Sequence, residues 1–95
     1  MNRGRERVSR RVVVVNRLGL HARAAAQFVR LARSFEADIW VEKDGIRVNA
    51  KSILGLMMMA AGPGTVLRIT AEGPDARRAV EALAALVGDR FGEAE

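Results

Sequence analysis

Two hydrophobic periodicities alternate along the chain, and their order limits the folds that it can adopt. Period-two patterns rich in β-branched residues predict strands over 11–15, 37–42, 46–50 and 66–71. Helical spacing of apolar residues predicts amphipathic helices over 22–34, 53–61 and 76–87. The predicted element order is therefore β-α-β-β-α-β-α.

The two middle strands give the clearest local signal, because only Asp44 and Gly45 separate them. A two-residue Asp-Gly connection is typical of a tight β-hairpin. Four half-polar strands and three amphipathic helices favour an antiparallel sheet that carries the helices on one face and exposes the other face to water. The predicted fold class is α+β. The side chains predicted to lie on the open face are Trp40, Arg47, Arg68 and Thr70.

The net charge of +5 is concentrated at the N-terminus. Residues 1–11 hold five arginines and one glutamate, so the rest of the chain is nearly neutral. A chain of 95 residues is long enough for one globular domain. We expect a basic, flexible tail over 1–8, one domain over 9–91 and a C-terminal tail over 92–95; an anionic partner for the basic tail is the alternative.

The rare residue types exclude several kinds of chemistry. The chain has no cysteine and one histidine, His21, which excludes disulfides and thiol catalysis and argues against a metal site. The longest mainly apolar stretch, 53–61, is far shorter than the roughly 20 residues of a membrane span, and the arginine-rich start lacks an apolar signal-peptide core. We therefore expect a cytoplasmic protein with no membrane insertion, no metal and no cofactor.

His21 lies at the predicted start of the first helix, after a glycine-containing turn. The free backbone N–H groups and the dipole at a helix start favour an anion, and Arg23 adds a guanidinium that can bind two phosphate oxygens. Both positive groups favour the neutral imidazole, which is the nucleophilic form. Taken alone, a histidine at a helix start is more often a capping or packing residue.

Two motifs carry a resemblance to a known family. Residues 19–25, Gly-Leu-His-Ala-Arg-Ala-Ala, resemble the Gly-(Ile/Leu/Met)-His-Ala-Arg-Pro-Ala signature of HPr, the histidine-containing phosphocarrier of the bacterial phosphotransferase system. Residues 51–57, Lys-Ser-Ile-Leu-Gly-Leu-Met, resemble the second motif of that family. Shorter matches at 64–66 and 71–73 extend the resemblance over nearly all of 9–91.

The resemblance implies a fold and an activity. The fold would be an open-faced β-sandwich with sheet order 1-4-2-3 and three helices on one face. His21 would accept a phosphoryl group on Nδ1 from enzyme I and donate it to an enzyme IIA component of a sugar permease, with Arg23 in contact with the phosphate. We expect a monomer, because such a carrier offers one site to several partners.

The resemblance also implies a regulatory site and a docking surface. Ser52 occupies the position that an HPr kinase/phosphorylase phosphorylates in many relatives, and its structural alternative is a helix N-cap. The apolar run 53–61 has more apolar residues than one buried face of a short helix can hold, so part of it should be exposed. The residues implied in docking are Leu20, Gln27, Arg30, Leu54 and Met57.

One departure from the family pattern lies beside the histidine, and other functions remain open. Ala24 stands where the family usually has proline, which leaves the geometry of His21 and Arg23 and the choice of partners open. One alternative is therefore a regulatory HPr paralogue without a role in sugar transport. A small nucleic-acid-binding domain is disfavoured because the strands lack stacking aromatics, and an acylphosphatase-like hydrolase because no matching loop or base is present.

Overall fold

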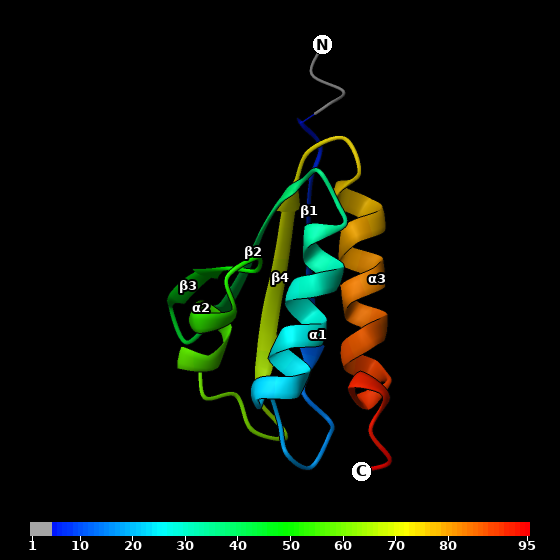
Figure 1. Cartoon of the computed structure of the whole chain (residues 1–95). Helices are drawn as coiled ribbons and strands as arrows, with labels where there is room; N and C mark the ends of the chain where they lie inside the picture. Colours follow the sequence, from blue (N-terminus) through cyan, green and yellow to red (C-terminus); the bar gives the residue numbers. More distant parts are fainter. Residues whose placement is uncertain (1–4) are drawn as a thin grey trace.

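Four antiparallel strands form a single sheet in the order β1-β4-β2-β3 (Figure 1). The computed structural model describes residues 5–95. The strands are β1 (Arg7–Val13), β2 (Asp38–Lys43), β3 (Ile46–Asn49) and β4 (Val66–Glu72), and the helices are α1 (Ala22–Arg33), α2 (Ile53–Met58) and α3 (Ala76–Gly88). The predicted α+β class, element order and sheet order are confirmed.

The helices form the second layer of an open-faced sandwich. Helices α1 and α3 lie side by side against one face of the sheet, and α2 packs beside α1 near the β3 edge (Figure 1). Burial of apolar side chains between the two layers provides the main stabilisation. The largest fully buried side chains include Phe28, Leu67, Ile69, Leu83 and Phe91.

The first strand begins earlier than predicted. Arg7 and Val8 pair with Glu72 and Ala71 of β4, so these two residues belong to the sheet and not to a flexible tail over 1–8. Arg5 and Arg7 also lie 3.5 and 3.8 Å from the Glu72 carboxylate. The sequence pattern does not predict this early start, because Arg7 and Arg10 interrupt the apolar pattern of the strand. Residues 1–4 of the predicted tail lie outside the described residues.

The second helix is shorter than the predicted 53–61. It ends at Met58, and Ala60 adopts a positive φ of 50° that takes the chain out of the helix. The Lys43 Nζ donates to the Met59 carbonyl oxygen at 2.7 Å, which satisfies a backbone acceptor at this helix end. The long apolar run therefore combines a short helix with a loop that returns to the sheet.

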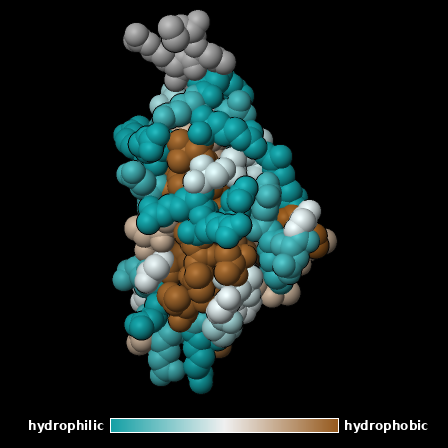
Figure 2. All heavy atoms as spheres, turned by 180° about the vertical axis from the view of Figure 1, so that it is seen from behind, coloured by the Kyte–Doolittle hydropathy of each residue, from teal (hydrophilic) through white to brown (hydrophobic). Residues whose placement is uncertain are grey.

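The open face of the sheet carries the four side chains predicted for it, although Thr70 is buried there. Its hydroxyl bonds that of Ser9 at 2.8 Å, and Trp40 is its cross-strand neighbour on the other side. The Arg47 guanidinium lies 4.2 Å from the centre of the Trp40 ring, a cation–π contact. Trp40 is the one aromatic residue in the four described strands. Figure 2 shows this face, where hydrophilic side chains cross an apolar area.

Candidate functional site

A tightly held loop delivers His21 to the start of α1. Gly19 has a φ of 68°, and a Cβ added there would lie 2.4 Å from the Ala61 carbonyl oxygen, so only glycine fits this close approach. The Leu20 N–H donates to the same oxygen at 2.8 Å. The buried Asn16 amide donates to the Gly19 carbonyl oxygen at 2.8 Å. These contacts fix the loop on both sides of the turn.

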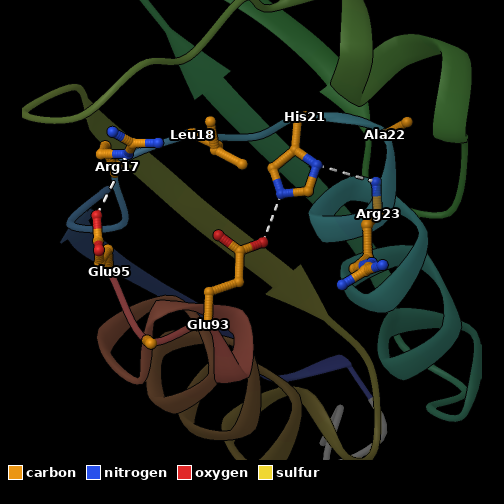
Figure 3. Close-up of a pocket in the computed structure, with 8 residues that line it drawn as sticks. Arg17, Leu18, His21, Ala22, Arg23, Glu93 and Glu95 are labelled. Atoms are coloured by element: carbon orange, nitrogen blue, oxygen red, sulfur yellow. Dashed lines mark hydrogen bonds and ion pairs between the residues drawn. The ribbon is translucent and has the colours of Figure 1, made fainter.

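The imidazole of His21 is the N-cap of α1. Its Nδ1 accepts a hydrogen bond from the Arg23 backbone N–H at 3.3 Å. On the other edge of the ring, Nε2 is in hydrogen-bond contact with the Glu93 carboxylate (Figure 3). A carboxylate accepts, so Nε2 carries the proton and Nδ1 presents its lone pair to the helix start. The side chain is 29% exposed, which leaves it open to a partner.

The last residues of the chain complete this site. Three consecutive residues with positive φ, Arg90, Phe91 and Gly92, turn the chain after α3, and the buried Phe91 anchors the turn in the core. The C-terminus therefore lies at the same end of the molecule as the start of α1 (Figure 1). The Arg17 N–H donates to the Glu95 carbonyl oxygen at 2.6 Å. The predicted tail 92–95 is thus part of the site's wall.

Charged groups of both signs line an open pocket of about 640 Å³ around His21. Hydrogen bonds from Asn16 and then from His21 lower the pKa of the Glu93 carboxyl below its usual value, with a smaller contribution from the charge of Arg23. Glu93 is therefore ionised at neutral pH. Glu95 pairs with the Arg17 guanidinium at 3.4 Å, and the Arg23 side chain lines the opposite part of the pocket (Figure 3).

Two further observations concern metal ligands and membrane-spanning helices. Among residues 5–95, no three His, Cys, Asp or Glu side chains converge to hold a metal ion. None of the helices in the same residues is long and apolar enough to span a membrane.

Ser52 is the N-cap of α2, which is the structural role that the sequence suggested as an alternative to regulation. Its Oγ accepts from the Gly55 N–H at 3.2 Å, and its backbone has the extended conformation usual for this position. The side chain is partly exposed at this helix start.

The residues implied in docking do not all lie at the surface. Leu54 and Met57 are 71% and 44% exposed on α2, and Gln27 and Arg30 line a groove on α1. Leu20 is 6% exposed and belongs to the hydrophobic core, so it offers little surface to a partner, and its docking role stays a prediction. Its N–H donates to the Ala61 carbonyl oxygen, which helps to position the adjacent histidine.

Sequence reasoning missed four residues of the site. Asn16, Arg17, Glu93 and Glu95 hold or line the pocket around His21. A polar asparagine at the end of a β-branched strand was a usable signal, because a buried amide must have a partner. No local pattern predicts that the C-terminal residues lie beside His21, since their position depends on where α3 and Phe91 pack.

Comparisons with known proteins agree with the fold and identify the family. Residues 8–89 match the family model described as the PTS HPr component phosphorylation site. The phosphocarrier protein HPr of Cupriavidus necator is 44% identical over 88 residues, which cover 93% of this chain and 99% of the relative. The HPr-like protein Crh of Bacillus subtilis is 49% identical over 80 residues, 84% of this chain and 94% of the relative. The crystal structure of HPr-C-His from Thermoanaerobacter tengcongensis has a TM-score of 0.86 at 44% identity and covers 95% of this chain and 99% of that chain.

Proposed function

Since the chain belongs to the HPr family of phosphocarriers, we propose that His21 Nδ1 accepts a phosphoryl group from phospho-enzyme I and passes it to enzyme IIA proteins. The observation that carries this proposal is the ring orientation. Nε2 bonds Glu93, while Nδ1 lies at the N-terminus of α1 beside the Arg23 N–H. The nitrogen that has a free electron pair is therefore the one beside the donors that suit a phosphate.

In the proposed transfer, the Nδ1 lone pair attacks the phosphorus atom of the donor. The new N–P bond forms while the bond to the donor breaks, and the electron pair of that bond returns to the donor. The Arg23 N–H then turns from Nδ1 to a phosphoryl oxygen, and the Arg23 guanidinium neutralises part of the negative charge. The helix dipole adds about 0.3–1 kcal/mol, which is small enough for the phosphoryl group to leave again.

Phosphoryl incorporation tests this function directly. The chain is incubated with phosphoenolpyruvate and its own enzyme I, and the bound phosphate is measured for the parent chain, His21→Ala and Ala24→Pro. We expect acid-labile phosphate on the parent chain and none on His21→Ala. We expect Ala24→Pro to change the rate with little effect on the fold, because an N–H in the first helical turn needs no intrahelical partner. Incorporation that survives His21→Ala would contradict the proposal.

The exposed faces of α1 and α2 are the proposed docking surface. Helix α1 contains three basic residues, all arginine, and no acidic residue. Beside it, Leu54 and Met57 of α2 are exposed and apolar. A partner with acidic residues around an apolar centre would complement this surface.

A charge introduced into the docking surface tests it. Met57→Glu should leave the unfolding transition in place and reduce kcat/KM for phosphoryl transfer about tenfold, because it places a carboxylate where acidic partners approach. Ile46→Glu is the matched control, since Ile46 is 61% exposed at the β2–β3 turn. Equal transfer by both variants and the parent chain would contradict the docking role.

Phosphorylation of Ser52 by an HPr kinase/phosphorylase is the proposed regulation. The partly exposed hydroxyl and the family motif at 51–57 support it, and a phosphate there would add negative charge beside the docking residues Leu54 and Met57. Incubation with a bifunctional HPr kinase and ATP should label the parent chain and not Ser52→Ala. Labelling that is absent from the parent chain, or unchanged in Ser52→Ala, would remove this role.

A regulatory paralogue without a role in sugar transport is the second candidate. The similarity to the HPr-like protein Crh and the alanine at position 24 favour it. The two candidates differ in the second transfer step. Rapid onward transfer from phosphorylated His21 to enzyme IIA proteins of the same organism supports the transport carrier, whereas incorporation without onward transfer supports the regulatory protein.

A further inference from the structure

The carboxylate of Glu93 is placed to act on the proton of the active imidazole. We propose that Glu93 is a positioning residue that keeps Nε2 protonated while the phosphoryl group is on Nδ1, and so keeps that group transferable. This inference rests on the proposed function of His21. It assigns a role in phosphoryl transfer to the C-terminal residues 92–95, which the sequence motifs do not include.

The position of Glu93 is fixed by contacts on two sides. One carboxylate oxygen contacts Nε2 of His21, and the other accepts from the Asn16 amide at 3.0 Å. Asn16 is fully buried, and its amide also donates to Gly19 of the loop that delivers His21. The Glu93 side chain is 16% exposed, so its charge is only partly screened by water. One buried amide therefore links the loop, the imidazole and the carboxylate.

Phosphorylation and the Glu93 contact use opposite edges of the ring. Nδ1 points to the start of α1, and Nε2 points to the C-terminal segment (Figure 3). The phosphoryl group can therefore be added without displacing the carboxylate. Once Nδ1 carries phosphorus and Nε2 carries a proton, the ring is cationic, and the carboxylate stabilises that cation.

The proton on Nε2 determines how good a leaving group the imidazole is when the N–P bond breaks. When the phosphoryl group passes to an acceptor, the N–P bond breaks and its electron pair stays on Nδ1. With Nε2 protonated, the departing ring is neutral imidazole. Without that proton, the departing ring is an imidazolate anion, a much poorer leaving group. By holding the proton, Glu93 favours onward transfer.

The other charged groups in the pocket are Arg17, Arg23 and Glu95. The Arg23 backbone N–H lies on the Nδ1 side of the ring, and the Arg23 charge helps to lower the pKa of the Glu93 carboxyl. Glu95 pairs with Arg17 at 3.4 Å, so these two charges largely cancel near the ring. Glu93 is the carboxylate in contact with Nε2, and Glu95 provides a matched control of equal charge two residues away.

The test compares the parent chain, Glu93→Gln and Glu95→Gln after phosphorylation with phosphoenolpyruvate and enzyme I. A glutamine oxygen can still accept from Nε2, so Glu93→Gln removes the charge and keeps an acceptor at the ring, while its NH2 group replaces the oxygen that accepts from Asn16. The ring nitrogens are followed by NMR as a function of pH, and the rate of phosphate loss is measured over the same range. We expect the midpoint for loss of the Nε2 proton to fall by about one pH unit in Glu93→Gln.

Above the midpoint, that shift should make phosphate loss and onward transfer about tenfold slower in Glu93→Gln, while Glu95→Gln behaves as the parent chain. A Glu93→Gln protein that takes up phosphate on His21 and titrates like the parent chain would overturn the inference and leave the proposed function intact. Absence of phosphate on His21 in all three proteins would instead overturn the proposed function, and the inference with it.

Discussion

The starts of α1 and α2 are both capped by the side chain of a candidate phosphorylation site, yet they differ in construction. At α1, His21 accepts from a backbone N–H, and its second nitrogen is held by Glu93 from the opposite end of the chain. At α2, Ser52 accepts from the Gly55 N–H, and the helix runs for only six residues. The α1 start is assembled from segments that lie far apart in the sequence, whereas the α2 start is a local cap.

The comparison teaches that a cap and a reactive centre differ in what surrounds them. A local cap needs one acceptor atom and contributes stability. A reactive imidazole also needs a proton on the ring nitrogen that does not react, a positive charge near the phosphate, and enough exposure for a partner to reach it. His21 has these surroundings, so loss of the Arg23 charge beside it should affect transfer, whereas loss of the Ser52 hydroxyl should affect stability.

The largest effect is expected from a change in the loop that supports only one of the two helix starts. Gly19→Ala should lower the free energy of unfolding by about 3 kcal/mol, because its Cβ would collide with the Ala61 carbonyl oxygen at an unfavourable positive φ. Chemical denaturation measures this loss. Gly62→Ala is the control, since an added Cβ there meets no atom within 4 Å. Equal stability of the two variants would contradict the tight loop.

The second effect separates transfer from stability at the α1 start. Arg23→Gln should slow phosphoryl transfer about 30-fold, which corresponds to about 2 kcal/mol, because a charged hydrogen bond to the phosphate is lost. The unfolding free energy should stay within about 0.5 kcal/mol of the parent value. Arg10→Gln, an exposed change on β1, is the control and should transfer at the parent rate. Normal transfer by Arg23→Gln would mean that the guanidinium does not contact the phosphate.

The α2 start should give the reverse result. Ser52→Ala removes the oxygen that accepts from the Gly55 N–H, and it should cost about 1 kcal/mol of stability. Transfer from enzyme I to His21 should remain normal in the same protein. A loss of transfer without a loss of stability would show that Ser52 belongs to the docking or reactive machinery and would break the contrast between the two helix starts.

The smallest effect on stability is expected at the start of α3, where Asp75 is the N-cap, and it should depend on pH. The Asp75 carboxylate accepts from the backbone N–H groups of Glu36 and Ala37, each at 2.9 Å. Burial works to raise the pKa of this carboxyl, but these hydrogen bonds outweigh it and lower its pKa below the usual 3.8. The native state thus favours the ionised form, so its stabilisation is present above pH 3.8 and is lost as the pH falls further.

Asp75→Asn should therefore cost about 0.5–1 kcal/mol at neutral pH and lose less stability than the parent chain on acidification below pH 4. Denaturation curves at pH 7 and pH 3.5 measure both values. A parent chain and variant with parallel pH dependence would contradict the role of these hydrogen bonds.

The fold was largely predictable from the sequence because its signals are local. The Asp44-Gly45 turn, the period-two strands and the amphipathic helices each occupy a few neighbouring residues. The first strand was placed too late, because Arg7 and Arg10 carry no apolar signal even though their backbone pairs with β4. Alternation identifies strands only where side-chain polarity follows burial.

The site was predictable only in part, for a different physical reason. His21, Arg23 and the Ser52 cap lie at helix starts that local sequence can locate. Glu93 reaches His21 only after α3 has packed and Phe91 has anchored the turn that follows it. The burial of Leu20 likewise follows from the approach of the loop to Ala61. Such contacts depend on the tertiary structure, which no short motif records.

The central claim is that Nδ1 of His21 receives the phosphoryl group while Nε2 keeps its proton. Nitrogen-15 NMR of the chain labelled in its histidine, recorded before and after phosphorylation by phosphoenolpyruvate and enzyme I, measures this directly. We predict phosphorus coupling to Nδ1 of His21 and a proton on Nε2 in both states at neutral pH. Phosphorus coupling to Nε2, or phosphate bound to another residue, would contradict the account.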